Sequence, residues 1–357
     1  MNIVVAGGGT AGHIDPALNL ADEIIRRHPD ARVTALGTAR GLETTLVPAR
    51  GYPLELIPPV PMPRRLNADA LTLPIRLRDS IKATRNILDR VGADVVIGFG
   101  GYVAIPAYLA ARGRVPFIVH EANAKPGLAN RVGARFADAV AETVAGSLPN
   151  AHHTGVPLRR SITELDRQAK RAEARNHFGI SQEARVLLVF GGSQGARSIN
   201  GTVTQCLDTG VFEDVTVLHA VGMKNEFPSE PTDHYRPYAY VDRMDLAYAA
   251  ADFVISRSGA MTVAEISAVG LPACFVPFPI GNGEQSLNAL PVVNAQGAVL
   301  VRDQEFTADY VANVVMPIMH SPDTLSTMGD QSKSVGRADA ASRLADLVDQ
   351  VLAKAQS

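Results

Sequence analysis

Two glycine-rich loops carry the clearest chemical signal in the sequence. Residues 7–13 (GGGTAGH) follow a β-branched run and open a helical pattern, and residues 191–197 (GGSQGAR) do the same in the second half. Glycine lets backbone amides approach a ligand closely, and the N-terminus of a helix favours an anion. The pattern predicts phosphate binding at both loops, and a tight turn that binds nothing is the alternative.

The first loop also matches the dinucleotide-binding pattern GxGxxG, but the match is incomplete. In nicotinamide enzymes an acidic residue at the end of the second strand holds the ribose. Here that strand ends at Leu36 and Gly37, and the next acidic residue is Glu43. The sequence therefore disfavours a nicotinamide-dependent enzyme.

His13 directly follows the first loop, and a neutral imidazole at that place suits general-base chemistry. A histidine that bonds to the backbone at the helix start is the alternative. If His13 only binds a ligand, Glu121 and Tyr102 are the next candidates for the base.

Two later strands are also followed by polar residues or glycines. These residues are Gly100, Gly101 and Tyr102 after one strand, and His120, Glu121 and Asn123 after the next. Open parallel sheets bind ligands at the carboxyl ends of their strands. A metal site at His120 and Glu121 is disfavoured, because no third ligand is spaced nearby and the chain has no DxD triplet.

The second half contains a more specific segment, residues 257–265 (RSGAMTVAE), between a strand and a helix. Small residues at a helix start suit a diphosphate, and Glu265 can accept two hydrogen bonds from a ribose diol. A first-turn glutamate favoured by the helix dipole is the alternative. Residues 283–289 form a polar run after another strand, which predicts a ligand-binding loop.

Residues 58–85 combine prolines with a helical pattern of aliphatic and basic residues. The basic residues are Arg64, Arg65, Arg76, Arg78, Lys82 and Arg85. The segment predicts an amphipathic surface for anionic lipid headgroups. A helix that packs on its own domain, with solvated arginines, is the alternative.

The elements that must position these residues alternate between strand and helix along the whole chain. Predicted strands are residues 3–6, 32–36, 94–98, 117–120, 137–141, 186–190, 215–220, 253–256, 273–276 and 299–301. Predicted helices include residues 16–27, with Asp15 as N-cap, and residues 338–355. The alternation predicts an α/β protein with two Rossmann-like, doubly wound parallel sheets.

The chain has 357 residues, enough for about two domains. We expect domains at residues 1–163 and 164–336, with residues 337–357 forming a helix that returns to the first. The net charge of -2 disfavours a nucleic-acid partner, which requires a basic excess. Cys206 and Cys274 have no metal-binding spacing and predict a reducing cytoplasm. We expect neither a signal peptide nor a membrane-spanning segment, so membrane association would be peripheral.

Together these motifs resemble those of the MurG family of peptidoglycan glycosyltransferases, in order along nearly the whole chain. The matching segments are residues 8–13, 100–103, 120–123, 191–197 and 257–260. The resemblance implies the GT-B fold, in which two Rossmann-like domains face each other across a cleft. It implies inverting transfer of N-acetylglucosamine from UDP-GlcNAc to lipid I (undecaprenyl-diphosphate-MurNAc-pentapeptide), which forms the β-1,4 link of lipid II. Such an enzyme works at the cytoplasmic face of the cell membrane, without a cofactor or a tightly bound metal.

The resemblance also implies roles for individual residues. The implied donor contacts are Thr10, Ala11, Gly12, Asn123, Arg159, Ser193, Val241, Glu265 and Gln285. The implied acceptor contacts are His13, Gly100, Gly101, Tyr102 and His120. Val241 would meet the uracil through its backbone, Glu265 the ribose and Gln285 the sugar hydroxyls. The implied partners are UDP-GlcNAc, lipid I and an anionic membrane surface, with other cell-wall synthesis proteins as further candidates.

This sequence departs from the family pattern at Ala11, Ala122 and Glu284, where Gly, Gln and His are usual. Two other functions remain open. A UDP-sugar 2-epimerase would share the donor site but would need carboxylates for elimination and re-addition. A non-catalytic nucleotide-sugar sensor would need neither His13 nor an acceptor site.

Overall fold

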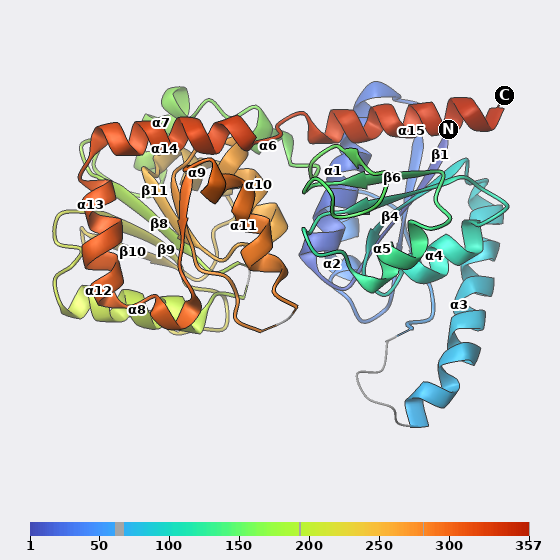
Figure 1. The fold of residues 1–357 in the computed structure, drawn as a ribbon, viewed down its shortest axis with the longest axis horizontal. Coiled ribbons are helices and arrows are strands. Elements are labelled where there is room, and N and C mark those ends of the chain that lie inside the picture. The colour runs from blue at the N-terminus through green and yellow to red at the C-terminus, as the bar shows by residue number, and fades with distance from the viewer. Residues whose placement is uncertain (61–67, 193, 281, 357) are drawn as a thin grey trace. The chain divides into compact units, whose positions relative to one another are not determined.

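The structure is a computed structural model that describes residues 1–60, 68–192, 194–280 and 282–356. The chain divides into two compact units (Figure 1). The first unit contains Met1–Leu158 together with Asp339–Ser357, and the second contains Arg159–Ala338. The division falls shortly before the expected boundary at residue 163.

The first unit is built on a seven-stranded sheet with the order β3-β2-β1-β4-β5-β6-β7, in which every pair is parallel. The strands are β1 Asn2–Gly7, β2 Arg32–Gly37, β3 Leu54–Leu56, β4 Val95–Gly100, β5 Phe117–Glu121, β6 Ala139–Glu142 and β7 His152–His153. Neighbours on β1 such as Ile3 and Val4 pack into different cores, so this strand is buried on both faces.

Helices cover both faces of this sheet. Helices α1 (Ala11–Arg27) and α15 (Ala340–Gln356) pack on one face, and α3 (Ala68–Val91) and α4 (Ala104–Ala111) pack on the other. Two short helices, α2 (Glu43–Ala49) and α5 (Leu128–Gly133), follow strands β2 and β5. None of the helices in the described parts of the chain has the length and apolar composition that a membrane span requires.

The second unit is built on a six-stranded parallel sheet with the order β10-β9-β8-β11-β12-β13. The strands are β8 Val186–Phe190, β9 Thr216–Ala220, β10 Tyr235–Tyr238, β11 Phe253–Ser256, β12 Ala273–Phe275 and β13 Ala298–Leu300. The α-helices are α6 Arg160–Thr163, α7 Arg167–His177, α8 Arg197–Asp208, α9 Met244–Ala250, α10 Ala260–Ala268, α11 Glu284–Asn294, α12 Ala308–Tyr310, α13 Met316–Met319 and α14 Pro322–Val335. Two parallel-sheet α/β units confirm the predicted fold class.

Each sheet reverses its strand order at one point, between β1 and β4 in the first unit and between β8 and β11 in the second. At such a switch point the loops after two neighbouring strands lead in opposite directions and leave a crevice for a ligand. The glycine loop after β1 and the segment 101–103 after β4 flank the first crevice. Residues 191–192, 194–196 and 257–259 flank the second. Both glycine loops therefore lie where a doubly wound sheet binds its ligands.

Helix α1 begins earlier than the sequence pattern indicated, and the prediction of Asp15 as its N-cap was wrong. The N-cap is Thr10, and the backbone N–H groups of His13 and Ile14 donate to the Thr10 carbonyl at 3.1 and 3.2 Å. The glycine loop thus passes directly into the helix, and Pro16 lies inside it. This early start places His13 in the first turn.

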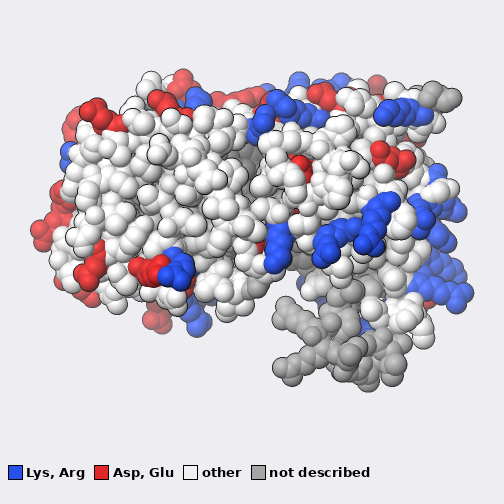
Figure 2. Space-filling model, in the orientation of Figure 1, with Lys and Arg blue, Asp and Glu red and all other residues white. Residues whose placement is uncertain are grey.

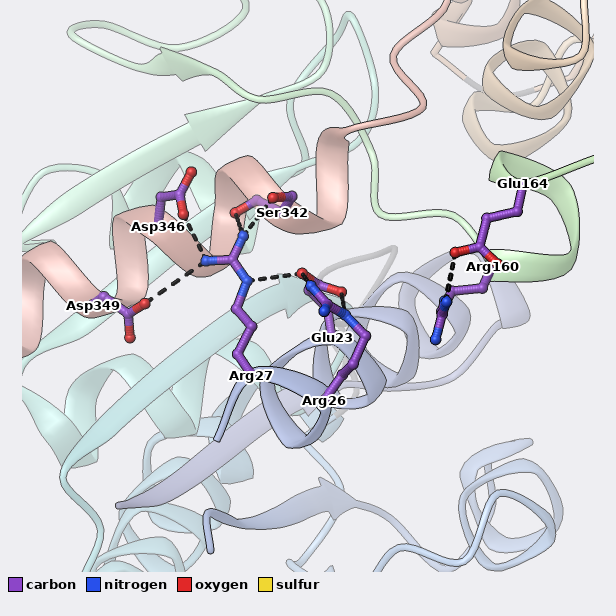
Figure 3. A network of polar contacts seen from close by, with 8 residues as sticks. All are labelled: Glu23, Arg26, Arg27, Arg160, Glu164, Ser342, Asp346 and Asp349. Carbon is purple, nitrogen blue, oxygen red and sulfur yellow. Dashed lines mark hydrogen bonds and ion pairs between the residues drawn. The ribbon is translucent and has the colours of Figure 1, made fainter. Parts of the chain in front are cut away.

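A cluster of ion pairs holds α15 against α1 (Figure 3). Arg27 donates from Nε to Glu23 at 2.8 Å and from Nη1 to Asp346 at 2.6 Å. Its Nη2 donates to the Ser342 carbonyl at 2.8 Å, and Arg26 pairs with Glu23 at 2.7 Å. The guanidinium of Arg27 therefore lies between groups of both helices, beside a core to which Leu344 and other α15 residues contribute.

Candidate active site

The crevice of the first unit opens into a cavity of about 450 Å³. Its polar end is formed by residues that follow β1, β4 and β5. These residues are His13, Gly100, Gly101, Tyr102, Glu121, Asn123 and Asn130. The structure therefore brings the predicted base and both of its alternatives together in one place.

His13 is held as a neutral imidazole with a defined tautomer. Its Nδ1 lies 3.2 Å from the Gly8 carbonyl and 3.2 Å from Thr10 Oγ1. A carbonyl only accepts hydrogen bonds, so Nδ1 carries the proton and donates to Gly8, which leaves the lone pair on Nε2. Burial lowers the pKa of His13 below 6.5, while the Glu121 carboxylate and the Gly8 hydrogen bond oppose that shift. An imidazole that is neutral at pH 7 with a free Nε2 can accept a proton.

Two glycines keep the space around this imidazole open. Gly100 and Gly101 have φ angles of +98° and +80°, a region that favours glycine. A Cβ atom on Gly101 would lie 2.2 Å from the Gly8 carbonyl oxygen, and one on Gly100 would lie 3.1 Å from His13 Cδ2. Both positions favour glycine because of their positive φ angles, and Gly101 also packs directly against the Gly8 backbone.

Glu121 is buried at the end of β5, and its carboxylate organises the loop that follows. Oε1 accepts from the Asn123 backbone at 2.9 Å, and Oε2 accepts from the Gly127 backbone at 3.0 Å. Oε2 also accepts from Asn130 Nδ2 at 2.9 Å, and the buried Tyr108 hydroxyl donates to Asn130 Oδ1 at 2.7 Å. Most of the lone pairs of Glu121 are thus committed to protein groups, and this favours an electrostatic and positioning role.

His120 does not line the cavity. Its side chain has an exposed fraction of 0%, and its Nε2 lies 2.9 Å from the Gly155 carbonyl, to which it donates. Burial lowers its pKa to about 4. In this conformation no ligand reaches the ring, so we interpret His120 as a support for β5 instead of the acceptor contact that the resemblance implied.

Glu43 shapes the first glycine loop, and the sequence analysis did not identify that role. The side chain is fully buried, and Oε2 accepts from the Gly9 backbone at 3.0 Å. Oε1 accepts from the backbone and hydroxyl of Thr38 at 2.8 and 3.0 Å. A Cβ atom on Gly41 would lie 1.8 Å from this carboxylate. A single carboxylate therefore joins the loops after β1 and β2.

The crevice of the second unit holds another cavity, of about 580 Å³. It is lined by the glycine loop, by the N-terminus of α8 and by Arg197, Lys224, Gly259, Thr262 and Gln285. Gly195, at φ +72°, approaches so closely that a Cβ atom would lie 2.0 Å from the Val221 carbonyl oxygen. Backbone amides, a helix N-terminus and two cationic side chains together suit a diphosphate.

Arg257 also lines this cavity, is nearly buried, and joins several loops through its guanidinium. Nη1 donates to the carbonyls of Val276 and Pro277 at 3.0 and 3.1 Å and pairs with Asp303. Nη2 donates to Ser198 Oγ, in the first turn of α8, at 2.7 Å. These contacts fix the loops after β11 and β12 relative to the start of α8.

Of the other predicted donor residues of the second unit, Gln285 lines this cavity, and Glu265 and Val241 do not. Glu265 is half-buried on α10 and accepts from the Tyr248 hydroxyl at 2.9 Å. Gln285 Oε1 accepts from the Phe278 backbone at 2.9 Å, which turns the carboxamide toward that loop. Val241 is buried just before α9. Ser193 lies outside the described residues.

The remaining predicted residues and the unusual Glu284 have clear positions. Thr10 and Gly12 are exposed and Ala11 is half-buried at the start of α1, and Arg159 is exposed at the N-cap of α6. Glu284 accepts from the Asn282 backbone at 3.3 Å, and Asn282 Oδ1 accepts from the Glu284 backbone at 3.1 Å. Within the described residues, no three His, Cys, Asp or Glu side chains gather in an arrangement suited to a metal ion.

Comparison with known proteins decides the family. The profile of the glycosyltransferase family 28 N-terminal domain matches residues 3–142, and that of the C-terminal domain matches residues 186–344. The chain belongs to glycosyltransferase family 28. The two family domains contain the two sheets, and each includes one of the glycine loops.

Similar proteins show to which group within family 28 the chain belongs. A protein from Saccharopolyspora erythraea is 57% identical over 98% of this chain and 94% of its own length. It is named UDP-N-acetylglucosamine–N-acetylmuramyl-(pentapeptide) pyrophosphoryl-undecaprenol N-acetylglucosamine transferase. The crystal structure of MurG from Acinetobacter baumannii aligns over 98% of this chain and 99% of that one, with a TM-score of 0.79 and 25% identity. The resemblance to the MurG family is thus confirmed.

The UDP-GlcNAc 2-epimerase from Neisseria meningitidis also aligns with this chain. Its structure covers 99% of this chain and 100% of its own, with a TM-score of 0.67 and 14% identity. At this identity the likeness extends to the fold alone.

Proposed function

We propose that the protein transfers N-acetylglucosamine from UDP-GlcNAc to lipid I and so forms lipid II. The observation that carries this proposal is the high identity, over nearly the full chain, to a relative named for that reaction. The cavities of the two units agree with it, since one suits a diphosphate and the other holds a neutral histidine beside apolar walls.

The second unit binds the donor in this proposal. The diphosphate lies at the glycine loop and the start of α8, where amides and the helix dipole stabilise negative charge. Glu265 accepts hydrogen bonds from the ribose, the backbone of Val241 meets the uracil, and Gln285 contacts the sugar. Charge that develops on the departing diphosphate is stabilised by groups already oriented toward it, which is the most effective form of electrostatic catalysis.

The first unit binds the acceptor and supplies the base. His13 Nε2 takes the proton of the acceptor's 4-hydroxyl group while its oxygen attacks the anomeric carbon. The new C–O bond forms as the bond from that carbon to the UDP oxygen breaks, so the configuration inverts and UDP leaves. The resulting imidazolium is stabilised by the Glu121 carboxylate, whose charge acts on the pKa of His13 in this direction.

In this proposal the protein works at the cytoplasmic face of the cell membrane. It binds the membrane peripherally through the basic surface near α3, α4 and α5. Lys and Arg side chains gather on the first unit near α3, α4 and α5 (Figure 2). Residues 68–136 contain ten Lys or Arg and five Asp or Glu, although the whole chain has a net charge of -2. A basic surface attracts anionic lipids. Of the predicted lipid-facing arginines, Arg64 and Arg65 lie outside the described residues.

Three incubations test the proposed function. We expect UDP-GlcNAc alone to remain unchanged, and we expect UDP and a disaccharide product when a polyprenyl-linked acceptor is added. Epimerisation of UDP-GlcNAc alone would favour the 2-epimerase, and binding without turnover would favour a sensor. Transfer should persist in EDTA, and loss that magnesium restores would contradict the metal-free mechanism.

A further inference from the structure

The cavity of the first unit is lined in part by apolar side chains that the transfer of a sugar does not require. Its walls come from three helices and one loop, and the residues are Val60, Leu73, Leu77, Ile105, Pro106, Leu109, Leu128 and Val132. These side chains line the same 450 Å³ as His13 and Gly100. A cavity with one polar and one apolar end suits a ligand with the same division.

The chemistry of the acceptor has that division. Its diphosphate joins a sugar to a polyprenyl chain, so whatever holds the diphosphate has the sugar on one side and the first isoprene unit on the other. We infer that the apolar end of the cavity binds the isoprene units next to the diphosphate, so that this part of the lipid leaves the bilayer and lies inside the protein. The inference rests on the proposed function, since it places the lipid relative to the sugar that His13 activates.

One face of helix α3 lines the cavity, and another face is exposed. Leu73 and Leu77 are four residues apart, so they lie on one face of the helix, and both are half-buried in the cavity wall. Ile75 lies between them in sequence, does not line the cavity, and has an exposed fraction of 64%. A helix that only lay on the bilayer would not need a buried aliphatic face directed toward α4.

A series of short acceptors tests the inference without a membrane. MurNAc-pentapeptide diphosphates that carry a methyl group, or one, two or three isoprene units, are used below their micelle concentration. Each buried CH₂ contributes enough to predict that KM falls about ten-fold or more with the first isoprene units. KM should then level off once the cavity is filled. A KM that is independent of the chain, or that keeps falling without a plateau, would overturn the inference.

Matched variants separate the cavity from the outer surface. Leu77→Ser on α3 and Leu109→Ser on α4 should each raise KM for the two-unit acceptor by about ten-fold, with the KM for the methyl acceptor and kcat nearly unchanged. Ile75→Ser makes a similar change on the outer face of the same helix. It should keep the wild-type dependence on chain length and weaken binding to anionic vesicles.

Two readouts make these results decisive. Unchanged UDP affinity and an unchanged thermal unfolding temperature would establish that each variant is folded. If Leu77→Ser disturbs α3, the comparison rests on Leu109→Ser alone. Equal loss of chain-length dependence in all three variants would contradict the inference. Absence of transfer to every acceptor, including the methyl form, would instead refute the proposed function itself.

Discussion

At the switch point of the first unit, the glycine loop leads into His13 and a cavity whose far walls are leucine, isoleucine and valine. At the switch point of the second unit, the glycine loop leads into Arg197, and Lys224 and Gln285 line the same cavity. Both loops follow a central strand and open a helix. The topology thus decides where a ligand binds, and the few residues after each loop decide whether the site suits a proton transfer or a diphosphate.

The largest effect is expected from the residue that most distinguishes the two units. His13→Ala should lower turnover by about 10²–10⁴-fold, because it removes the general base that we propose. UDP affinity should stay nearly unchanged, since the proposed nucleotide site is in the second unit. Steady-state kinetics with UDP binding by calorimetry checks both. His28→Ala, an exposed histidine just past the far end of α1, is the control. A variant that lost acceptor affinity but kept kcat would make His13 a binding residue.

The complementary change in the second unit should act on the nucleotide. In the proposed function, Glu265→Ala removes two charge-assisted hydrogen bonds to the ribose, worth roughly 1.5–3 kcal/mol, so UDP affinity should fall by about ten-fold or more. Calorimetric titration with UDP measures this. Glu173→Ala, on the exposed face of α7 in the same unit, should have no effect.

Tyr248 provides a second control for that prediction. Tyr248→Phe removes the hydroxyl that donates to Glu265 and keeps the carboxylate, so it separates the ribose contact from the packing of α10. We expect a smaller loss of UDP affinity than with Glu265→Ala. Equal losses in both variants would mean that Glu265 supports α9 and α10 and does not contact the ribose.

A third prediction concerns the electrostatics within the first unit. Burial lowers the pKa of His13, and the Glu121 carboxylate partly raises it. Glu121→Gln removes that opposing charge, so the pKa of His13 should fall further. We expect the acidic limb of the wild-type kcat/KM profile below pH 6.5, and it should move to still lower pH in the variant.

The neighbouring strand offers a matched control for Glu121. Glu142 is also buried at the end of its strand and accepts from the backbone of Gly146 and Leu148 at 2.7 and 3.0 Å, but it does not line the cavity. Glu142→Gln should leave the acidic limb where it is. If Glu121→Gln instead abolished activity at every pH, Glu121 would replace His13 as the base.

The sequence predicted every interior strand of the two sheets and missed three of the four edge strands. All ten predicted strands exist within two residues of their expected bounds. Nine of them are paired on both sides, and such strands are buried and read as continuous apolar runs. The three strands that were not predicted, β3, β7 and β10, each lie at an edge of a sheet. They have only two to four residues and one neighbour each, so their pairing leaves little trace in local composition.

The same holds for the site: residues that follow a strand or loop were predicted, and contacts between residues far apart in the chain were not. His13, Glu121 and Tyr102 were predicted because each directly follows a strand or a glycine loop. Glu43 was noticed only as an acidic residue too late for a ribose contact, yet its carboxylate reaches Gly9, which is 34 residues away. Such a contact depends on the packing of α2 against the loop. The burial of His120 depends in the same way on Gly155, which lies 35 residues further along the chain.

The smallest effect is expected from the ion pairs that fasten α15 to α1. Arg26 and Arg27 lower the pKa of Glu23 from 4.5 to about 2. The carboxylate therefore contributes stability that is fully present above pH 4.5 and is lost as the pH falls toward 2. Because the cluster is partly solvated, Glu23→Gln should lower the free energy of unfolding by only about 0.5–1 kcal/mol at pH 7. Thermal unfolding at pH 7 and at pH 3 measures this, and the difference between wild type and variant should be smaller at pH 3. Neither turnover nor UDP affinity should change, since Glu23 lines neither cavity. A loss of turnover with normal stability would show that the α15 contact also controls the loop at the other end of α1, and the chemistry of the first unit would then depend on more than the residues around His13.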